Sequence, residues 1–540
     1  MATSRRLQNA AQVLDEIMAM DVDEIDDEDD DNDDDYNDNG NSTDDTELDD
    51  MSADESEAVS SENETETNNG NENSWCKVCD VDFVVDRYDF SIANTGVQIP
   101  AGSIPKTVGG MFQLFFTDDV MQNVADETNR YARAEIHAMR DQLKLRSIWK
   151  KWRDVSLTEM KCYIGVILKM AITNAADVKD YFSTTWDNYM PFFTDLFTRD
   201  RFCMIHWMLH VQPPSNPDPG QRQTRGEKVK NMVAHMKSKC AELYIPEQNI
   251  AVDETTISFK GRTSFLMYNP QKPTKWGLRV YSLADSKTGY FSQFEPYYGS
   301  CTKDILPYPD LSVPARVVLQ LVKGLIQDDR SSGYHVYTDR YYTSPALGVE
   351  LTKLGVSITG TVQKNRKLLP SDIKKKLKLK KNESVAWKNN KQLALVWQDK
   401  RLIFMYSTFH NAVSEEKERR KRGGEVEKII KPCVISDYTE HMGAVDRFDH
   451  YAVSYNFSRK TVKWWRKTFY WLLEVAIVNS YILWCQCYPQ DKLRHLAYRR
   501  KLINELVKDH RATKEVVRRG RPSEDFNLHK THCIYLGLFI

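Results

Sequence analysis

Apolar residues recur at intervals of three and four between residues 112 and 243, as in LFFTDDVMQNVADETNRYARAEIHAMRDQ (114–142). Ser156, Thr158 and Glu159 open a second run with the same spacing. This spacing is typical of amphipathic helices, and a Ser or Thr followed by Glu is a signal for a helix start. The first part of the chain is therefore expected to be helical.

After Pro246 the pattern changes to short alternating runs. Residues 250–259, 277–284 and 290–298 read as strands, and DSKTG (285–289) reads as the turn of a hairpin between the last two. Further along, predicted helices at 317–325 and 345–354 alternate with predicted strands at 335–339 and 356–362. Alternating strands and helices predict an α/β sheet as the core.

Residues 366–432 interrupt this alternation. The basic runs KKKLKLKK (374–381) and KERRKR (417–422) bracket two strand-like runs, 392–397 and 402–407. We expect a lysine-rich inserted subdomain. Helical periodicity returns over residues 437–506.

The most apolar stretch, residues 468–488, has the length of a membrane span. Glu474, Asn479, Ser480 and Gln486 interrupt it, and a central Glu costs about 2.5 kcal/mol or more in lipid. A buried helix of a large domain is the favoured interpretation.

The charge is unevenly distributed. The 540 residues carry 74 Lys and Arg against 77 Asp and Glu, but residues 1–74 hold 27 acidic residues and two arginines, which leaves 72 basic and 50 acidic residues, a net +22, for the rest. Residues 21–73 are too polar to form a core, so we expect a disordered acidic segment. It either keeps the chain soluble or competes with nucleic acid for the basic remainder.

The ten cysteines are mostly isolated along the chain, which favours a reducing compartment over a disulfide framework. Cys76 and Cys79 have the spacing of half a zinc site, but no second pair lies nearby. The first 20 residues lack the apolar run of a signal peptide. Cytosol or nucleus is the expected compartment.

Four aspartates are candidates for metal chemistry. Asp253 follows an apolar pair in IAVDE, Asp339 ends HVYTD, and Asp446 and Asp449 lie three apart in GAVDRFDH, a spacing that puts both on one helix face. Carboxylates converging from different elements can hold two Mg²⁺ ions about 3.5–4 Å apart. The alternative for each is a cap or a salt-bridge partner.

Four blocks of sequence resemble, in order, the piggyBac transposase family. They are VDETTISFKGRTSFLMYNPQKPTKWGLRVYSLADSKTGY (252–290), YTDRYYTSPALGVEL (337–351), ITGTVQKNRKLLP (358–370) and DYTEHMGAVDRFDHY (437–451). The helical region agrees through ETNRYA (127–132), WRDVSLTEMKCYIGVIL (152–168) and TRDRFCMIHWMLH (198–210). The resemblance covers residues 108–505 approximately.

The resemblance implies an α/β fold with a ribonuclease-H-like core, a mixed sheet flanked by helices. Its catalytic and metal-binding residues would be Asp253, Asp339 and Asp446, with Asp449 as an additional carboxylate. The implied cofactor is a pair of Mg²⁺ ions, with Mn²⁺ as a substitute. The implied reaction is hydrolysis of a DNA strand, then transfer of the freed 3′ hydroxyl into TTAA targets through a hairpin on the transposon end. A nuclear homodimer on DNA is implied, with no membrane partner and no small-molecule substrate.

The resulting domain organisation combines these predictions. It comprises a disordered acidic region over 1–107, a helical dimerisation and DNA-binding region over 108–248, a catalytic core over 249–365 and 433–456, the lysine-rich insertion over 366–432, a C-terminal helical DNA-binding region over 457–510 and a basic tail over 511–540.

The chain departs from the family pattern in two places. Arg340 follows the second aspartate where the family usually has Asn, so it would weaken metal binding if it paired with a catalytic carboxylate. The family's C-terminal zinc domain is expected to be missing, because the tail offers only Cys533, His529 and His532, and zinc is not expected as a cofactor of this protein.

Two short basic segments are candidate DNA contacts. KTVKWWRK places Lys463, Trp464, Trp465 and Arg466 together, which suits phosphate contact with base stacking. The alternative is a helix end over a buried aromatic pair. In VVRRGRP (516–522), Arg519 and Arg521 resemble an AT-hook and are also DNA-binding candidates, with a flexible basic linker as the alternative.

Three functions remain to be weighed. The four aspartates favour an active transposase, while the missing zinc domain and Arg340 favour a domesticated derivative that binds DNA or chromatin without transposition. An acidic-tailed or membrane-anchored interaction protein explains neither the ordered blocks nor the basic charge.

Overall fold

The fold described below is that of a computed structural model. It describes residues 75–513, with gaps at 80–82, 86, 214–224, 271, 273, 327–332, 421–423, 425 and 458. The acidic segment 1–74 and residues 514–540 of the basic tail, with Arg519 and Arg521, lie outside the described residues.

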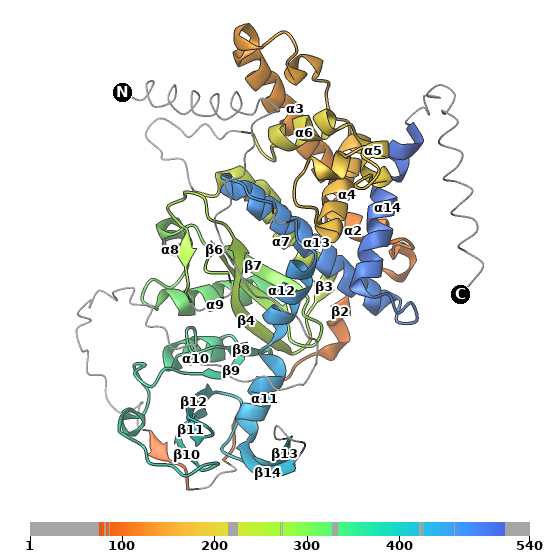
Figure 1. The fold of residues 1–540 in the computed structure, drawn as a ribbon. Helices are drawn as coiled ribbons and strands as arrows, with labels where there is room; N and C mark the ends of the chain where they lie inside the picture. Colours follow the sequence, from red (N-terminus) through yellow and green to blue (C-terminus); the bar gives the residue numbers. More distant parts are fainter. Residues whose placement is uncertain are drawn as a thin grey trace, which may run out of the picture.

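A mixed sheet forms the centre of the molecule (Figure 1). Its core strands are β4 (Asn249–Ser258), β6 (Trp276–Asp285), β7 (Phe291–Pro296), β8 (His335–Thr338) and β9 (Ser357–Thr361). β7, β6 and β4 are antiparallel neighbours, whereas β4, β8 and β9 run parallel. The two parallel steps follow the helices predicted between those strands, and the arrangement confirms the α/β, ribonuclease-H-like core.

Each face of this sheet is covered by helices. Ile250 and Val252 of β4 pack in one apolar cluster with α9 (Val313–Leu325) and α10 (Pro345–Lys353). Ala251, between them, points to the other face and belongs to a larger cluster with α11 (Cys433–His441), α12 (Ala444–Ser454) and the helical region. Successive strand residues alternate between faces, so the two faces carry different chemistry.

The insertion extends the core sheet rather than forming a separate body. Strand β12 (Leu402–Ser407) pairs with β9, and β11 (Gln392–Gln398), β10 (Ser384–Asn389) and β1 (Cys76–Lys77) continue the sheet outward. A short strand, β5 (Met267–Tyr268), borders the opposite edge on β6. A ribbon of β13 (Ser414–Arg420) and β14 (Val426–Pro432) leads into α11.

The segment before the helical region is structured where it is described, although we expected disorder to residue 107. Trp75 Nε1 donates to Leu368 O at 2.8 Å, and Phe83 is buried in the core. Strand β2 (Gly96–Val97) pairs with β3 (Tyr244–Ile245). This part of the prediction is corrected because the acidic composition that argued for disorder ends near residue 74, and apolar anchors follow.

The helical region packs beside the sheet and draws on both ends of the chain (Figure 1). Its helices are α2 (Val108–Gln113), α3 (Asp118–Ala138), α4 (Leu157–Thr173), α5 (Pro191–Leu196), α6 (Arg199–Met208) and α7 (Lys230–Leu243), then α13 (Trp464–Cys487) and α14 (His495–Thr513). One more helix, α8 (Ser300–Ile305), follows β7. Ser156 caps α4 by accepting from Glu159 N at 3.2 Å, as its sequence predicted.

Helix α13 contains the apolar stretch whose length matched a membrane span. It is long and apolar enough to cross a membrane, but 89% of its most apolar window is buried inside the protein. Glu474 within it accepts an ion-pair hydrogen bond of 3.2 Å from Arg499 Nη1, and both side chains are almost fully buried. The expectation of a buried helix is confirmed.

Candidate active site

Strand β4 presents two neighbouring carboxyl groups on opposite faces of the sheet. Asp253 follows Ala251 by two residues and shares its face, toward α12. Glu254 shares the other face with Ile250 and Val252, and its Oε2 accepts a hydrogen bond of 2.8 Å from Tyr342 Oη.

The parallel pairing of β4 with β8 brings the second aspartate beside the first. Val252 is in register with Thr338, and each is followed directly by an aspartate, Asp253 and Asp339. The Tyr341 backbone N–H donates to Asp339 Oδ1 at 2.9 Å and so orients this carboxylate at the end of β8.

Helix α12 brings the third and fourth carboxylates over the same face. Phe448 is buried and stacks on Phe291 of β7, with ring centroids 3.5 Å apart, which fixes the helix against the sheet. Asp449 Oδ1 accepts a hydrogen bond of 3.0 Å from the Thr255 hydroxyl of β4. Asp446 lies three residues earlier, exposed at the start of α12.

The carboxylates repel one another electrostatically. Burial, then the charges of Glu254, Asp339 and Asp446, raise the pKa of Asp253 well above its usual value. Burial and Glu254 raise the pKa of Asp339 to about 7. Burial likewise raises the pKa of Asp449 to about 7, with Asp446 adding to the effect. Burial is the largest cause at each of the three groups, and the positive charge nearby does not offset burial and the mutual repulsion of the carboxylates.

Such a donor set fits divalent metal ions. Hard cations such as Mg²⁺ and Mn²⁺ prefer carboxylate oxygens. Carboxylates from three elements provide these ligands, together with a negative electrostatic potential that attracts the cations. Asp253, Asp339 and Asp446 would hold the ions, with Asp449 beside them. The sequence prediction named these four, and the structure brings them to one face.

The sequence analysis did not identify Glu254, which follows Asp253 on the opposite face of the sheet. Glu254 is partly buried, and although burial opposes ionisation, Lys272, Arg279 and the Tyr342 hydrogen bond outweigh it and lower the pKa of Glu254. The signal available in the sequence was the second acid of IAVDE, next to Asp253. The negative charge of Glu254 is one cause of the raised pKa of both Asp253 and Asp339.

Arg340 is exposed beside Asp339. Among the ion pairs found between described residues, none involves Arg340, and its charge is the smallest of the causes named for the pKa of Asp339. The pairing with a catalytic aspartate that would weaken metal binding is therefore not found in this part of the chain.

The aromatic and basic start of α13 is largely buried. Trp465 is 2% exposed and Arg466 6% exposed, and Arg466 Nη2 donates to Trp207 O at 2.6 Å. Proposing these two as DNA contacts was wrong in this fold, because they hold α13 against α6; the buried aromatic alternative applies. Lys463 and Trp464 are half-buried, and their DNA contact stays a prediction.

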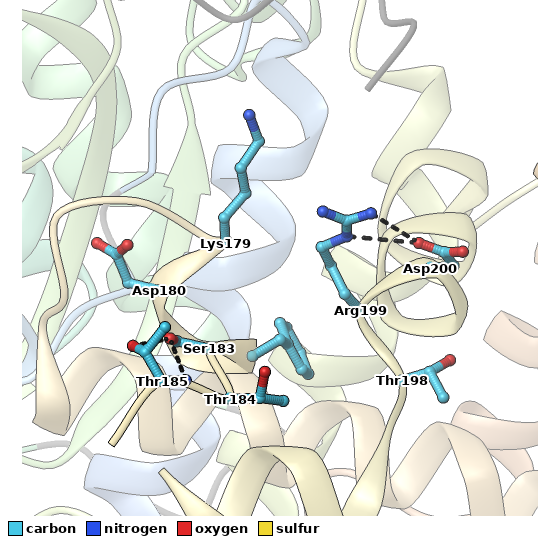
Figure 2. Close-up of a pocket in the computed structure, with 9 residues that line it drawn as sticks. Lys179, Asp180, Ser183, Thr184, Thr185, Thr198, Arg199 and Asp200 are labelled. Carbon is cyan, nitrogen blue, oxygen red and sulfur yellow. Dashed lines mark hydrogen bonds and ion pairs between the residues drawn. The ribbon is translucent and has the colours of Figure 1, made fainter. Parts of the chain in front are cut away.

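An open pocket of about 540 Å³ lies in the helical region, away from these carboxylates (Figure 2). Two cations and two carboxylates line it, and Arg199 is already paired with Asp200 at 3.4 Å. The pocket therefore has no surplus charge to select a ligand. Its lining is Lys179, Asp180, Phe182, Ser183, Thr184, Thr185, Thr198, Arg199 and Asp200.

Comparison of the sequence with known proteins finds a matching family model and related proteins. A family model described as Transposase IS4 matches residues 109–481. The human "PiggyBac transposable element-derived protein 2" is 26% identical over 427 residues, covering 77% of this chain and 68% of the relative. The human "PiggyBac transposable element-derived protein 3" is 24% identical over 431 residues, covering 78% of this chain and 68% of the relative.

A solved structure shares the fold. The structure described as "Cryo-EM structure of piggyBac transposase synaptic complex with hairpin DNA (SNHP)" aligns with a TM-score of 0.66 at 22% identity, over 81% of this chain and 87% of that one. The family match over residues 109–481, the relatives and the shared fold agree, and the chain belongs to the piggyBac transposase family.

Proposed function

We propose that this protein is a divalent-metal-dependent DNA transposase that hydrolyses a DNA strand and transfers the freed 3′ hydroxyl into TTAA targets. The observation that carries the proposal is the convergence of Asp253, Asp339 and Asp446 from β4, β8 and α12, with negative charge that the protein leaves uncompensated. Such a group has little use as a structural salt bridge.

The chain's own residues would orient the donors. Mg²⁺ or Mn²⁺, held by Asp253, Asp339, Asp446 and Asp449, would supply charge stabilisation and an activated oxygen nucleophile at the scissile phosphate. The Tyr341 backbone N–H fixes Asp339, and the Thr255 hydroxyl fixes Asp449. Lys272, whose charge lowers the pKa of Glu254, lies at the same place and suits a phosphate contact.

DNA is the proposed partner. The net +22 of residues 75–540 provides phosphate contacts, and the solved piggyBac transposase complex that shares this fold contains hairpin DNA. We further propose a homodimer and a nuclear location; the basic runs at 374–381 and 417–422 would serve as localisation signals.

A domesticated protein that binds DNA or chromatin without transposition is the second candidate. The human relatives are named as transposable element-derived proteins.

A strand-transfer assay separates the two. The purified full chain is incubated with a short duplex carrying a free 3′ hydroxyl and a supercoiled plasmid, with Mg²⁺, Mn²⁺ or chelator, and junctions are sequenced. Metal-dependent junctions at TTAA support the transposase. DNA binding without any nicking or joining in either metal would contradict the transposase and support the domesticated role.

A further inference from the structure

Three potential metal ligands lie together away from the catalytic carboxylates. His335 lies in β8, His410 follows β12, and Asp437 lies in α11. One ligand atom from each residue comes within 4.8 Å of the other two. His335 and His410 are buried, and Asp437 is partly buried, so the group sits at the edge of the core.

One distance between ligand atoms is close to that of a transition-metal site. His410 Nε2 and Asp437 Oδ2 are 3.1 Å apart. Bonds of about 2.0–2.1 Å to a tetrahedral ion put adjacent ligand atoms roughly 3.3 Å apart, so this edge has the right length. The Tyr337 hydroxyl donates a hydrogen bond of 2.6 Å to Asp437 Oδ2 and lies 2.9 Å from His335 Nδ1, so it holds these two ligand residues beside each other.

The remaining polar atom of each ligand is already held by a neighbour. His335 Nε2 bonds Thr359 Oγ1 at 2.8 Å, and His410 Nδ1 lies 3.1 Å from Ser407 Oγ. Asp437 Oδ1 lies 3.2 Å from His441 Nδ1. Histidine and carboxylate ligands in metalloproteins are oriented in this way by a second layer of hydrogen bonds.

We propose that His335, His410 and Asp437 form a zinc site, with the fourth position of the ion left to a water molecule. Two imidazoles and one carboxylate select a transition metal over Mg²⁺. The ion would clamp α11 to β8 and to the chain after β12. The site would hold its ion whether or not the protein is catalytic, and it lies at a different place from the zinc domain that the family resemblance puts at the C-terminus.

The test is the metal content and zinc affinity of the full chain, purified without chelators and dialysed against metal-free buffer. We expect about one zinc ion per chain that a large excess of Mg²⁺ does not displace. Co²⁺ added to chelator-treated protein should give the visible absorption of a tetrahedral complex with nitrogen and oxygen ligands. Absence of stoichiometric zinc, and failure to take up Zn²⁺ or Co²⁺ at micromolar concentration, would show a hydrogen-bonded network only and would overturn the proposal.

Variants locate the ion. His410→Gln and Asp437→Asn should each weaken zinc binding at least about tenfold, while the exposed His137→Gln serves as the matched control. The double variant Cys76→Ser/Cys79→Ser, the variant Cys533→Ser and Asp253→Asn should keep the ion. Loss of zinc in any of these three would place it elsewhere and contradict the site. Circular dichroism identifies a ligand variant that fails to fold. The Co²⁺ spectrum of the wild type is then compared with that of the ligand variant that folds.

Discussion

The hydroxyl of Thr255 on β4 donates a hydrogen bond of 3.0 Å to Asp449 Oδ1 on α12. This bond joins the strand that carries Asp253 to the helix that carries Asp446, and it opposes the rise in the pKa of Asp449 that burial causes. The relative position of the carboxylates therefore depends on a residue with no charge of its own.

Thr255→Val should damage both catalysis and stability. The variant keeps the shape and loses a hydrogen bond to a charged group, worth about 1.5–3 kcal/mol. We expect metal-dependent nicking to fall about tenfold, because Asp449 becomes harder to ionise and freer to move. Nicking rates and denaturant unfolding of Thr255→Val and Thr255→Ser are compared, and Ser, which keeps the hydroxyl, should retain most activity. Equal rates in both variants would argue against this role.

Arg340→Asn should leave metal-dependent nicking within about threefold of the wild type. Arg340 is exposed and contributes the smallest effect named on Asp339, and exposed charge interactions are weak. Titrating Mg²⁺ in the nicking assay measures this. A large gain in activity in the Asn variant would mean that Arg340 does oppose metal binding and that the domesticated role fits better.

The Glu474–Arg499 pair should be essential for stability. Glu474→Gln leaves the buried Arg499 without its countercharge and should lower the free energy of unfolding by about 3–5 kcal/mol. The double variant Glu474→Leu/Arg499→Met should recover much of this loss. Urea unfolding measures both, with Lys353→Ala in an exposed pair as the control, expected to change stability by less than about 1 kcal/mol. A small effect of Glu474→Gln would contradict the burial of α13.

His206 should make the protein less stable in mild acid. Burial lowers the pKa of His206 to about 3, against an ordinary value of 6.5, so the unfolded chain takes up a proton that the folded chain excludes. The contribution of this neutral histidine is complete above pH 6.5 and is lost as pH falls toward 3, by about 2 kcal/mol at pH 5.

His206→Gln should remove that part of the pH dependence, because glutamine does not titrate. Unfolding free energies at pH 7.5 and pH 5 are compared for the wild type, His206→Gln and the exposed control His137→Gln. An unchanged difference between the two pH values in His206→Gln would show that the imidazole is accessible to protons in the folded state.

The four aspartates of the site could be predicted from the sequence, whereas the residues that surround them could not. Asp253 and Asp339 were identified because they end apolar runs of strand type. Asp446 and Asp449 were identified because their spacing puts both on one helix face, and the family resemblance implied the catalytic roles. Glu254 was not identified, because strand alternation places it on the opposite face of the sheet from Asp253. Its hydrogen-bond partner Tyr342 is also distant in sequence. Pairing between remote residues carries no local signal.

The same limit explains the errors in the fold. Strand β1 pairs with β10 across more than 300 residues, so the acidic composition nearby dominated the prediction for that segment. Trp465 and Arg466 have the composition of a nucleic-acid contact, but α6 packs against them, and only the tertiary structure shows this. Helix periodicity and strand alternation were reliable because they are local.

The most direct test of the central claim is a plasmid nicking assay with single carboxylate variants. Supercoiled plasmid is incubated with the full chain in Mg²⁺ or Mn²⁺, and Asp253→Asn, Asp339→Asn and Asp446→Asn are compared with Asp310→Asn, an exposed aspartate of the same domain. We predict metal-dependent nicking by the wild type and the control and background cleavage by each of the three variants, since no single ligand can be lost without losing the site. Full activity in any one of them would contradict the assignment.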